Sequence, residues 1–129
     1  MGNILINDNV TIMTNDNIRE YVTTRNVKNM KNWDVSQVTD MEGLFKNFHC
    51  NEKVYLSDWD VSNVVNMKEM FAESSFQPVI YDWDVSKVNN MDSMFYKSTF
   101  NQPINEWDVS NVTNMRFMFA NSKFNQPIG

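Results

Sequence analysis

The sequence predicts an α/β fold: a short solenoid of about four rungs, each built from a short strand and a short helix, behind an N-terminal capping helix. The phrase W-D-V-S-x-V-x-x-M recurs with few changes, and its copies begin at Trp33, Trp59, Trp83 and Trp107. Successive copies start 26, 24 and 24 residues apart, and internal periods of this size are typical of solenoids. The positions that all copies share are mostly apolar, so each copy is predicted to be one structural rung that buries its apolar face against its neighbours.

The first element is expected to be a capping helix over residues 14–25, TNDNIREYVTTR. The Thr, Asn and Asp at its start are residue types that begin helices, and apolar residues at i, i+3 and i+4 from Ile18 would share one face. A solenoid needs such a cap because its first rung otherwise exposes a core face. The chain therefore divides into an N-terminal segment with the capping helix, residues 1–29, and the tandem-repeat solenoid, residues 30–129.

Each rung is expected to begin as an extended segment and to continue as a helix. W-D-V alternates apolar with polar residues as a short strand does, and the three prolines of the chain lie close to these segments. After the serine, apolar residues recur at i, i+3, i+6 and i+7, as in Val64, Met67, Met70 and Phe71. That spacing favours a helix of about two turns with the serine as its N-cap.

Polar residues recur as well, and they would form ladders along the solenoid. One ladder holds the acidic residue of every WDVS phrase, namely Asp34, Asp60, Asp84 and Asp108. Stacked carboxylates can bind a cation, but one Asp per rung is sparse beside the dense oxygen cluster of a calcium loop. The preferred interpretation is that these Asp residues, together with the recurring Ser and Asn, bond backbone groups that the rungs leave unpaired. Cation binding is the alternative.

The stretch from Phe100 to Phe119 spells F-N-Q-P-I-x-x-W-D-V-S-x-V-x-x-M-x-x-M-F, which resembles the repeat of the BspA-like leucine-rich-repeat family. The resemblance covers roughly residues 30–129. That family includes bacterial surface proteins and lipoproteins, with related copies in protists and large DNA viruses. It implies a solenoid of the leucine-rich-repeat kind that acts in adhesion or protein binding, and it brings no catalytic residues. The first rung departs from the pattern because it is two residues longer and lacks the F-N-Q-P phrase.

Composition narrows the classes of function. A net charge of −5 argues against nucleic-acid binding, which needs clustered Lys and Arg. No apolar stretch approaches the length of a membrane span, so membrane insertion is not expected, and the N-terminus does not resemble a signal peptide. The single cysteine, Cys50, cannot form an intrachain disulfide. These features favour an intracellular location, which for a viral protein would be the host cytoplasm or the virion.

The sequence predicts no catalytic, metal or cofactor site, and the protein is expected not to be an enzyme. His49 is the only histidine, so a multi-histidine metal site is excluded. His49 and Cys50 could form a nucleophilic pair, but such a pair needs a third group to orient it, and neighbours in a loop seldom converge. Three glycines are too few for a phosphate-binding loop.

The leading hypothesis is a non-enzymatic module that binds an unidentified protein through the positions that vary between rungs. The candidate surface in the third and fourth rungs consists of Lys87, Asp92, Ser93, Lys97, Ser98, Arg116, Phe117 and Lys123. The alternative is a structural or assembly protein that self-associates, for example as a homodimer, through an uncapped C-terminal rung. That open end would expose Phe119, Phe124 and Ile128.

Overall fold

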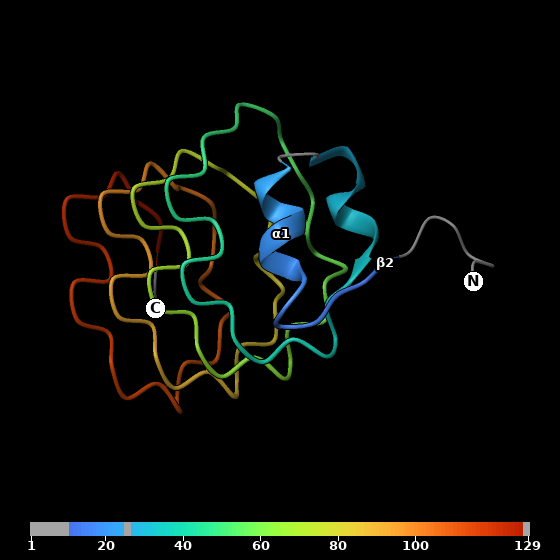
Figure 1. Ribbon diagram of the computed structural model, residues 1–129. Coiled ribbons are helices and arrows are strands. Elements are labelled where there is room, and N and C mark those ends of the chain that lie inside the picture. The colour runs from blue at the N-terminus through green and yellow to red at the C-terminus, as the bar shows by residue number, and fades with distance from the viewer. Residues whose placement is uncertain (1–10, 25–26, 128–129) are drawn as a thin grey trace, which may run out of the picture.

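The N-terminal strand lies beside the first WDVS phrase. The computed structural model describes residues 11–24 and 27–127. In it strand β2 (Thr11–Ile12) pairs in parallel with strand β3 (Trp33–Asp34) (Figure 1). The backbone N–H of Met13 extends this pairing by donating to the carbonyl of Asp34 at 2.8 Å. β2 therefore occupies the place that a preceding rung would have beside the first one.

Helix α1 (Ile18–Thr23) is shorter than the helix expected over residues 14–25. Its N-cap residue is Asn17, whose side chain makes no capping hydrogen bond. Asn17 instead exchanges two bonds with Thr14: its Oδ1 accepts the Thr14 N–H at 2.7 Å, and its own N–H donates to the Thr14 Oγ1 at 3.2 Å. This reciprocal pair has the form of a capping box, and the N–H of Ile18 donates to the carbonyl of Thr14 at 3.1 Å. Thr14 therefore caps the turn that leads into α1, as the sequence predicts. The 3-10 helix η1 (Val27–Asn32) then leads into β3.

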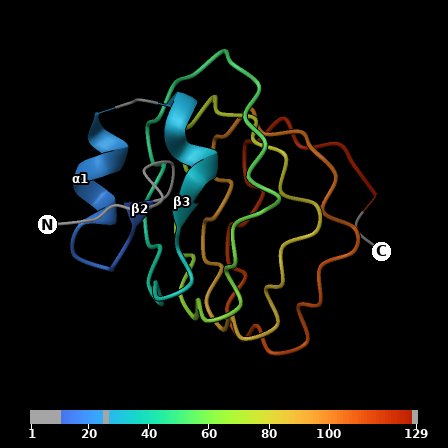
Figure 2. The ribbon, with the colours of Figure 1, turned by 90° about the vertical axis from the view of Figure 1, so that its right-hand side faces the viewer.

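Four rungs follow, numbered here 1 to 4, and each starts at the Trp of a WDVS phrase. They comprise residues 33–58, 59–82, 83–106 and 107–127. Parallel bridges join the same slot of successive rungs: Asp40 pairs with Asn66, Asn66 with Asn90, and Asn90 with Asn114. The rungs therefore run side by side in one direction, with α1 at one end of the stack and rung 4 at the other (Figure 2).

The wall segments, residues 41–48, 67–74, 91–98 and 115–122, are the parts for which the repeat predicts a short helix. Among the described residues they form turns and no helix. In rung 1 the N–H of Leu44 closes a turn onto the carbonyl of Met41 at 3.2 Å. The N–H of the preceding residue, Gly43, crosses to the carbonyl of Lys68 in rung 2 at 2.8 Å. Alternate N–H groups thus bond within the rung and between rungs, whereas a helix would use all of them internally.

Two residues of every wall segment have a positive φ, which a helix excludes because helical residues have φ near −60°. These residues are Gly43, Asn47, Glu69, Glu73, Ser93, Lys97, Phe117 and Asn121. Positive φ at the third position is the signature of a type II turn. A series of such turns brings residues three apart to the same side of the chain, as one turn of a helix does. The apolar spacing is therefore shared by both structures, and it does not distinguish them.

The recurring apolar residues form the core, as the sequence predicts. In rungs 1 to 3 the Trp and Val of WDVS and the Met and Phe of the wall are all less than 9% exposed. The indole rings stack from rung to rung, with centroids 6.0 Å apart between Trp33 and Trp59, 6.0 Å between Trp59 and Trp83, and 6.4 Å between Trp83 and Trp107. The wall phenylalanines form a second column at the opposite side of each rung, with neighbouring centroids 5.4 to 5.5 Å apart.

The Trp column is also tied together by hydrogen bonds. In rungs 2 to 4 the indole N–H donates to the backbone carbonyl that lies three residues before the Trp of the preceding rung. Trp83 reaches Leu56 at 2.9 Å and Trp107 reaches Ile80 at 3.2 Å, and Trp59 makes the equivalent bond to Met30 at 2.8 Å. A buried carbonyl is costly to leave unpaired. This bond explains why the repeat specifies Trp rather than another large apolar residue.

The polar ladders bond the backbone, which was the preferred interpretation of the sequence. Asp60 Oδ1 accepts both the N–H of Ser62 at 3.0 Å and its hydroxyl at 2.5 Å. Asn66 Oδ1 accepts the N–H of Lys68 at 3.0 Å. Both patterns recur in other rungs. The serine therefore belongs to a turn with Asp instead of capping a helix.

Candidate interaction surfaces

Two of the eight predicted surface residues are buried. Ser98 is 1% exposed, and its Oγ accepts the backbone N–H of Phe100 at 2.9 Å, as Ser74 does for Phe76 in rung 2. Ser98 thus has a structural role, and including it in the surface was wrong. Asp92 is 6% exposed.

Asp92 nevertheless contributes to the surface because it orients a neighbour. Its Oδ2 lies 3.4 Å from Nη2 of Arg116, and its Oδ1 accepts the hydroxyl of Ser93 at 2.7 Å. The Ser93 hydroxyl and, to a smaller extent, the Arg116 guanidinium hold the pKa of Asp92 below its ordinary value. Asp92 is therefore a carboxylate at neutral pH, and it fixes an arginine whose side chain is 73% exposed.

Arg116 and Phe117 form what we call the Arg116–Phe117 patch. The guanidinium carbon of Arg116 lies 5.6 Å from the centroid of the Phe117 ring, which is a cation–π distance. Phe117 is 61% exposed and has a φ of 55°. The same slot holds Gly43, Glu69 and Ser93 in rungs 1 to 3. A bulky residue is unusual in this backbone conformation, so the patch combines an exposed aromatic ring with local strain.

The remaining predicted residues do not gather at the patch. Lys87 follows the Asp–Ser turn of rung 3, and its Nζ donates to Asn63 Oδ1 at 3.1 Å. Lys97 lies near the end of its wall segment, where its Nζ is 5.3 Å from the ring centroid of Tyr96, and Lys123 lies just after the end of the last one. All three lysines are exposed. The structure therefore divides the predicted surface into separate groups, of which the Arg116–Phe117 patch is the most apolar.

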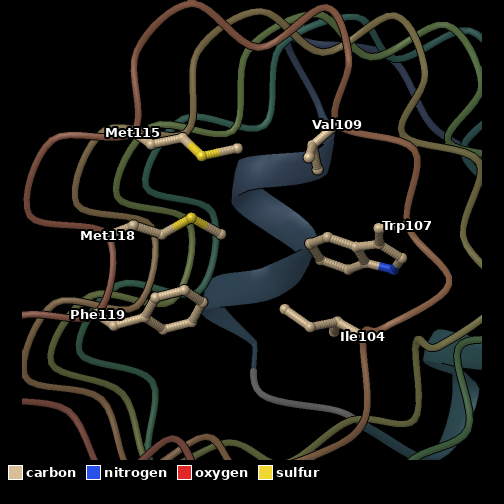
Figure 3. Close-up of a pocket in the computed structure, with 6 residues that line it drawn as sticks. All are labelled: Ile104, Trp107, Val109, Met115, Met118 and Phe119. Atoms are coloured by element: carbon tan, nitrogen blue, oxygen red, sulfur yellow. The ribbon is translucent and has the colours of Figure 1, made fainter. Parts of the chain in front are cut away.

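A second candidate surface is the end face, which is the side of rung 4 that points away from rung 3. A hollow there is lined by Ile104, Trp107, Val109, Met115, Met118 and Phe119, whose side chains point toward one another (Figure 3). Met115 is 42% exposed, whereas its counterparts in the other rungs are fully buried.

Two of the three residues that the sequence predicts at the open end are described by the structure, and both are partly exposed. Phe119 and Phe124 are half-buried, and their ring centroids are 4.5 Å apart. Ile128 lies outside the described residues. Sequence reasoning missed Val109 and Met115, although their repeat positions are core positions in every other rung.

The family comparison gives one result. The family model described as "Mycoplasma protein of unknown function, DUF285" matches residues 13–129. The chain belongs to this family. The match begins at Met13, so it includes α1 and η1 as well as the four rungs of this DUF285 member. Comparison with curated proteins and with solved structures gives no match.

His49 and Cys50, the pair considered as a possible nucleophilic site, belong to rung 1, whereas both candidate surfaces lie on rung 4. The exposed His49 has its Nδ1 3.1 Å from the Oγ of Ser75, and the thiol of Cys50 lies 3.9 Å from the carbonyl of Glu52. In the described part of this DUF285 chain, no three His, Cys, Asp or Glu residues are grouped to hold a metal ion. No helix within residues 11–24 and 27–127 is long and apolar enough to cross a membrane.

Proposed function

We propose that the chain is a short solenoid with no catalytic role that binds another protein through its side surface. Its resemblance to the BspA-like repeats implies this kind of function. The supporting observation is that the recurring residues and the variable residues occupy different places in the structure. The recurring residues fill the core or bond the backbone of the turns. The outward positions that differ between rungs are left to provide specificity, as in other repeat proteins.

Phe117 is the observation that carries the proposal. A left-handed backbone costs a residue with a side chain about 1–2 kcal/mol relative to the ordinary conformation. Most of the ring is in water, so burial returns little of that cost. Aromatic residues and Arg are enriched at protein interfaces and among the residues that dominate binding energy. An exposed Phe beside an oriented Arg is therefore the feature of this surface that fits a protein partner best.

The test compares wild type with Phe117→Gly in affinity capture from the source cell, with the bound proteins identified by mass spectrometry. Glycine adopts a positive φ without strain, so this variant keeps the fold while it loses the ring. Tyr81→Ser is the matched control because it removes another exposed aromatic ring, which is 48% exposed, from a different rung. We expect specific partners with wild type and the control, and their loss with Phe117→Gly. Equal capture by all three proteins would contradict the proposal.

A second proposed function is assembly, in which another polypeptide covers the end face. The supporting observation is Met115, which is 42% exposed although the same position is otherwise a core position. Amide exchange of rung 4 should then be slower in protein isolated from its source than in the isolated recombinant chain. Identical exchange in the two preparations would argue against assembly through this face.

A further inference from the structure

We propose that the end face receives a further rung of the same repeat, one whose leading edge is uncovered. This inference rests on the assembly function above and names the class of partner. It starts from the direction of the hydrogen bonds between wall segments. In each pair of successive rungs, the N–H groups of the earlier wall donate to the carbonyls of the later wall. From rung 3 to rung 4 the four bonds are Met91 to Asn114, Ser93 to Arg116, Phe95 to Met118 and Lys97 to Ala120, at 2.7 to 2.9 Å.

The same one-way pattern joins rungs 1 and 2 and rungs 2 and 3. This direction holds for the backbone bonds of the central part of each wall. It reverses at the end of the walls, where the N–H of Thr99 donates to the carbonyl of Ser74 and the N–H of Lys123 donates to the carbonyl of Ser98. Each wall therefore has two unlike edges. In the central part of the wall the leading edge, which faces the preceding rung, carries carbonyl acceptors, and the trailing edge, which faces the following rung, carries N–H donors.

The trailing edge of rung 4 is a row of donors without acceptors. The row consists of the N–H groups of Met115, Phe117, Phe119 and Asn121, and none of them has a partner among the described residues. The hollow of Figure 3 lies beside this row, because Met115 and Phe119 belong to both. The end face thus combines an apolar floor with a line of donors that bond to water while the face is exposed and that need a line of acceptors once it is covered.

A rung of the same repeat supplies acceptors for the donor row and apolar side chains for the hollow. Its leading edge carries carbonyls at the spacing of the donors, and its Trp and Phe would continue the two aromatic columns. The Ile104 carbonyl already accepts the N–H of Trp107 at 3.1 Å. The equivalent carbonyls of Leu56 and Ile80 accept that bond and an indole N–H from the next rung as well. The end face is therefore a continuation of the interface that already joins rung 3 to rung 4.

A second copy of this chain fits less well in either orientation. If two end faces met wall against wall, donors would face donors, and each buried N–H would lack an acceptor. If the end face met the opposite end of another copy, α1 and β2 would block it. In that position Arg19 already donates to the carbonyls of Glu42 and Asp40, which are leading-edge acceptors of rung 1. The donor row thus argues against the homodimer that the apolar residues alone suggest.

The experiment uses the full chain and a synthetic peptide that copies residues 100–127, a single rung with a free leading edge. Amide exchange is followed by NMR as peptide is added. We expect exchange at Met115, Phe117, Phe119 and Asn121 to slow by about tenfold at a peptide concentration about ten times the dissociation constant. A control peptide with Ala at the positions of Trp107 and Phe119 should give no protection. Met115→Asp in the full chain should abolish the effect, and unchanged exchange in rung 3 shows that the variant is folded.

Three results would overturn the proposal: no protection at the solubility limit of the peptide, equal protection by the control peptide, or protection that appears without peptide as the chain is concentrated. The last result would identify a second copy as the occupant. If rung 4 is protected in protein isolated from its source but the peptide has no effect, the assembly function stands and this partner class is wrong.

Discussion

The two ends of the stack carry the same kind of rung but differ in what covers it. At the N-terminal end Met41 is fully buried, and the ring of Tyr21 packs edge-on against Trp33 with centroids 5.9 Å apart. At the other end Met115 is 42% exposed. The N-terminal cap also provides the polar groups that a preceding rung would supply, because Arg19 donates to two leading-edge carbonyls. Capping such a stack therefore requires a match of hydrogen-bonding groups as well as apolar cover.

The largest expected effect is the loss of stability when a Trp is removed, and it should be greater in the middle of the stack than at its end. Trp83→Ala should destabilise the protein by about 3–5 kcal/mol, because the ring stacks on both neighbours and its indole N–H bonds to Leu56. Trp107→Ala should cost less, since Trp107 stacks on a Trp on one side only. Urea titrations of both variants measure this difference. Lys87→Ala is the control and should change stability by less than about 0.5 kcal/mol. Equal losses for the two Trp variants would mean that the ends are equivalent.

Removing the polar part of the N-terminal cap should have the next largest effect. Arg19→Ala leaves the carbonyls of Asp40 and Glu42 without their guanidinium partner, and a buried unpaired group costs about 1–3 kcal/mol. Solvent access at this edge should keep the loss near the lower limit. Amide exchange should quicken first in rung 1, and a urea titration gives the total. Lys46→Ala is a suitable control because it removes an exposed ion pair, 3.2 Å from Glu69, that contributes little. Faster exchange that begins in rung 4 would contradict this account.

An effect of similar size distinguishes two equivalent serines, one buried in rung 3 and one half-buried in rung 4. Ser98→Ala removes the buried acceptor of the Phe100 N–H and should cost about 1–3 kcal/mol. Ser122 makes the same bond to Phe124 at 3.2 Å, but both residues are only half-buried, so water can replace the hydroxyl after Ser122→Ala. Chemical denaturation of the two variants measures the difference. A larger loss for Ser122→Ala would show that the end rung is protected in solution.

The smallest effect concerns acid stability. The Ser62 hydroxyl and backbone N–H lower the pKa of Asp60, and the corresponding groups of Ser110 lower the pKa of Asp108. A carboxyl whose pKa is lower in the folded state stabilises the fold above its unfolded pKa, and this contribution is lost as the pH falls through the folded pKa. Ser62→Ala should therefore raise the pKa of Asp60 toward its ordinary value, which NMR titration of the side chain measures. It should also move acid unfolding to a slightly higher pH. Asp108 in the same variant should titrate as in wild type.

The repeat positions made the core predictable, and the local backbone was the part that sequence reasoning missed. Trp, Val, Met and Phe at fixed spacing identify buried positions in any structure that stacks equal units. Their period did not reveal the turns, because Glu69 and Ser93 are not residues that usually signal a positive φ. Gly43 in the same slot was one clue, and Asn47 and Asn121 in the second slot were others, since glycine and asparagine accept that conformation more readily than other residues.

The candidate surfaces were predictable to a smaller extent. Phe117 could be identified because it differs from its counterparts, but Ser98 resembles a variable position until its slot is compared with Ser74 and Ser122. The donor row on the end face has no sequence signal, since it consists of backbone N–H groups. Its direction depends on which way the carbonyls of one rung point toward the next, and only coordinates contain that information.

The regular spacing of the rungs has a consequence for how such genes can change. The bonds between rungs 2, 3 and 4 join residues that are about one repeat apart, and the repeats starting at Trp59, Trp83 and Trp107 have equal length. Loss or duplication of one whole repeat would therefore bring together edges that already fit, with every donor facing an acceptor. A deletion one codon shorter would shift all later turns out of register. Recombination between the near-identical WDVS segments produces whole-repeat changes by its nature, so the length of the stack can vary between generations without a new interface having to evolve.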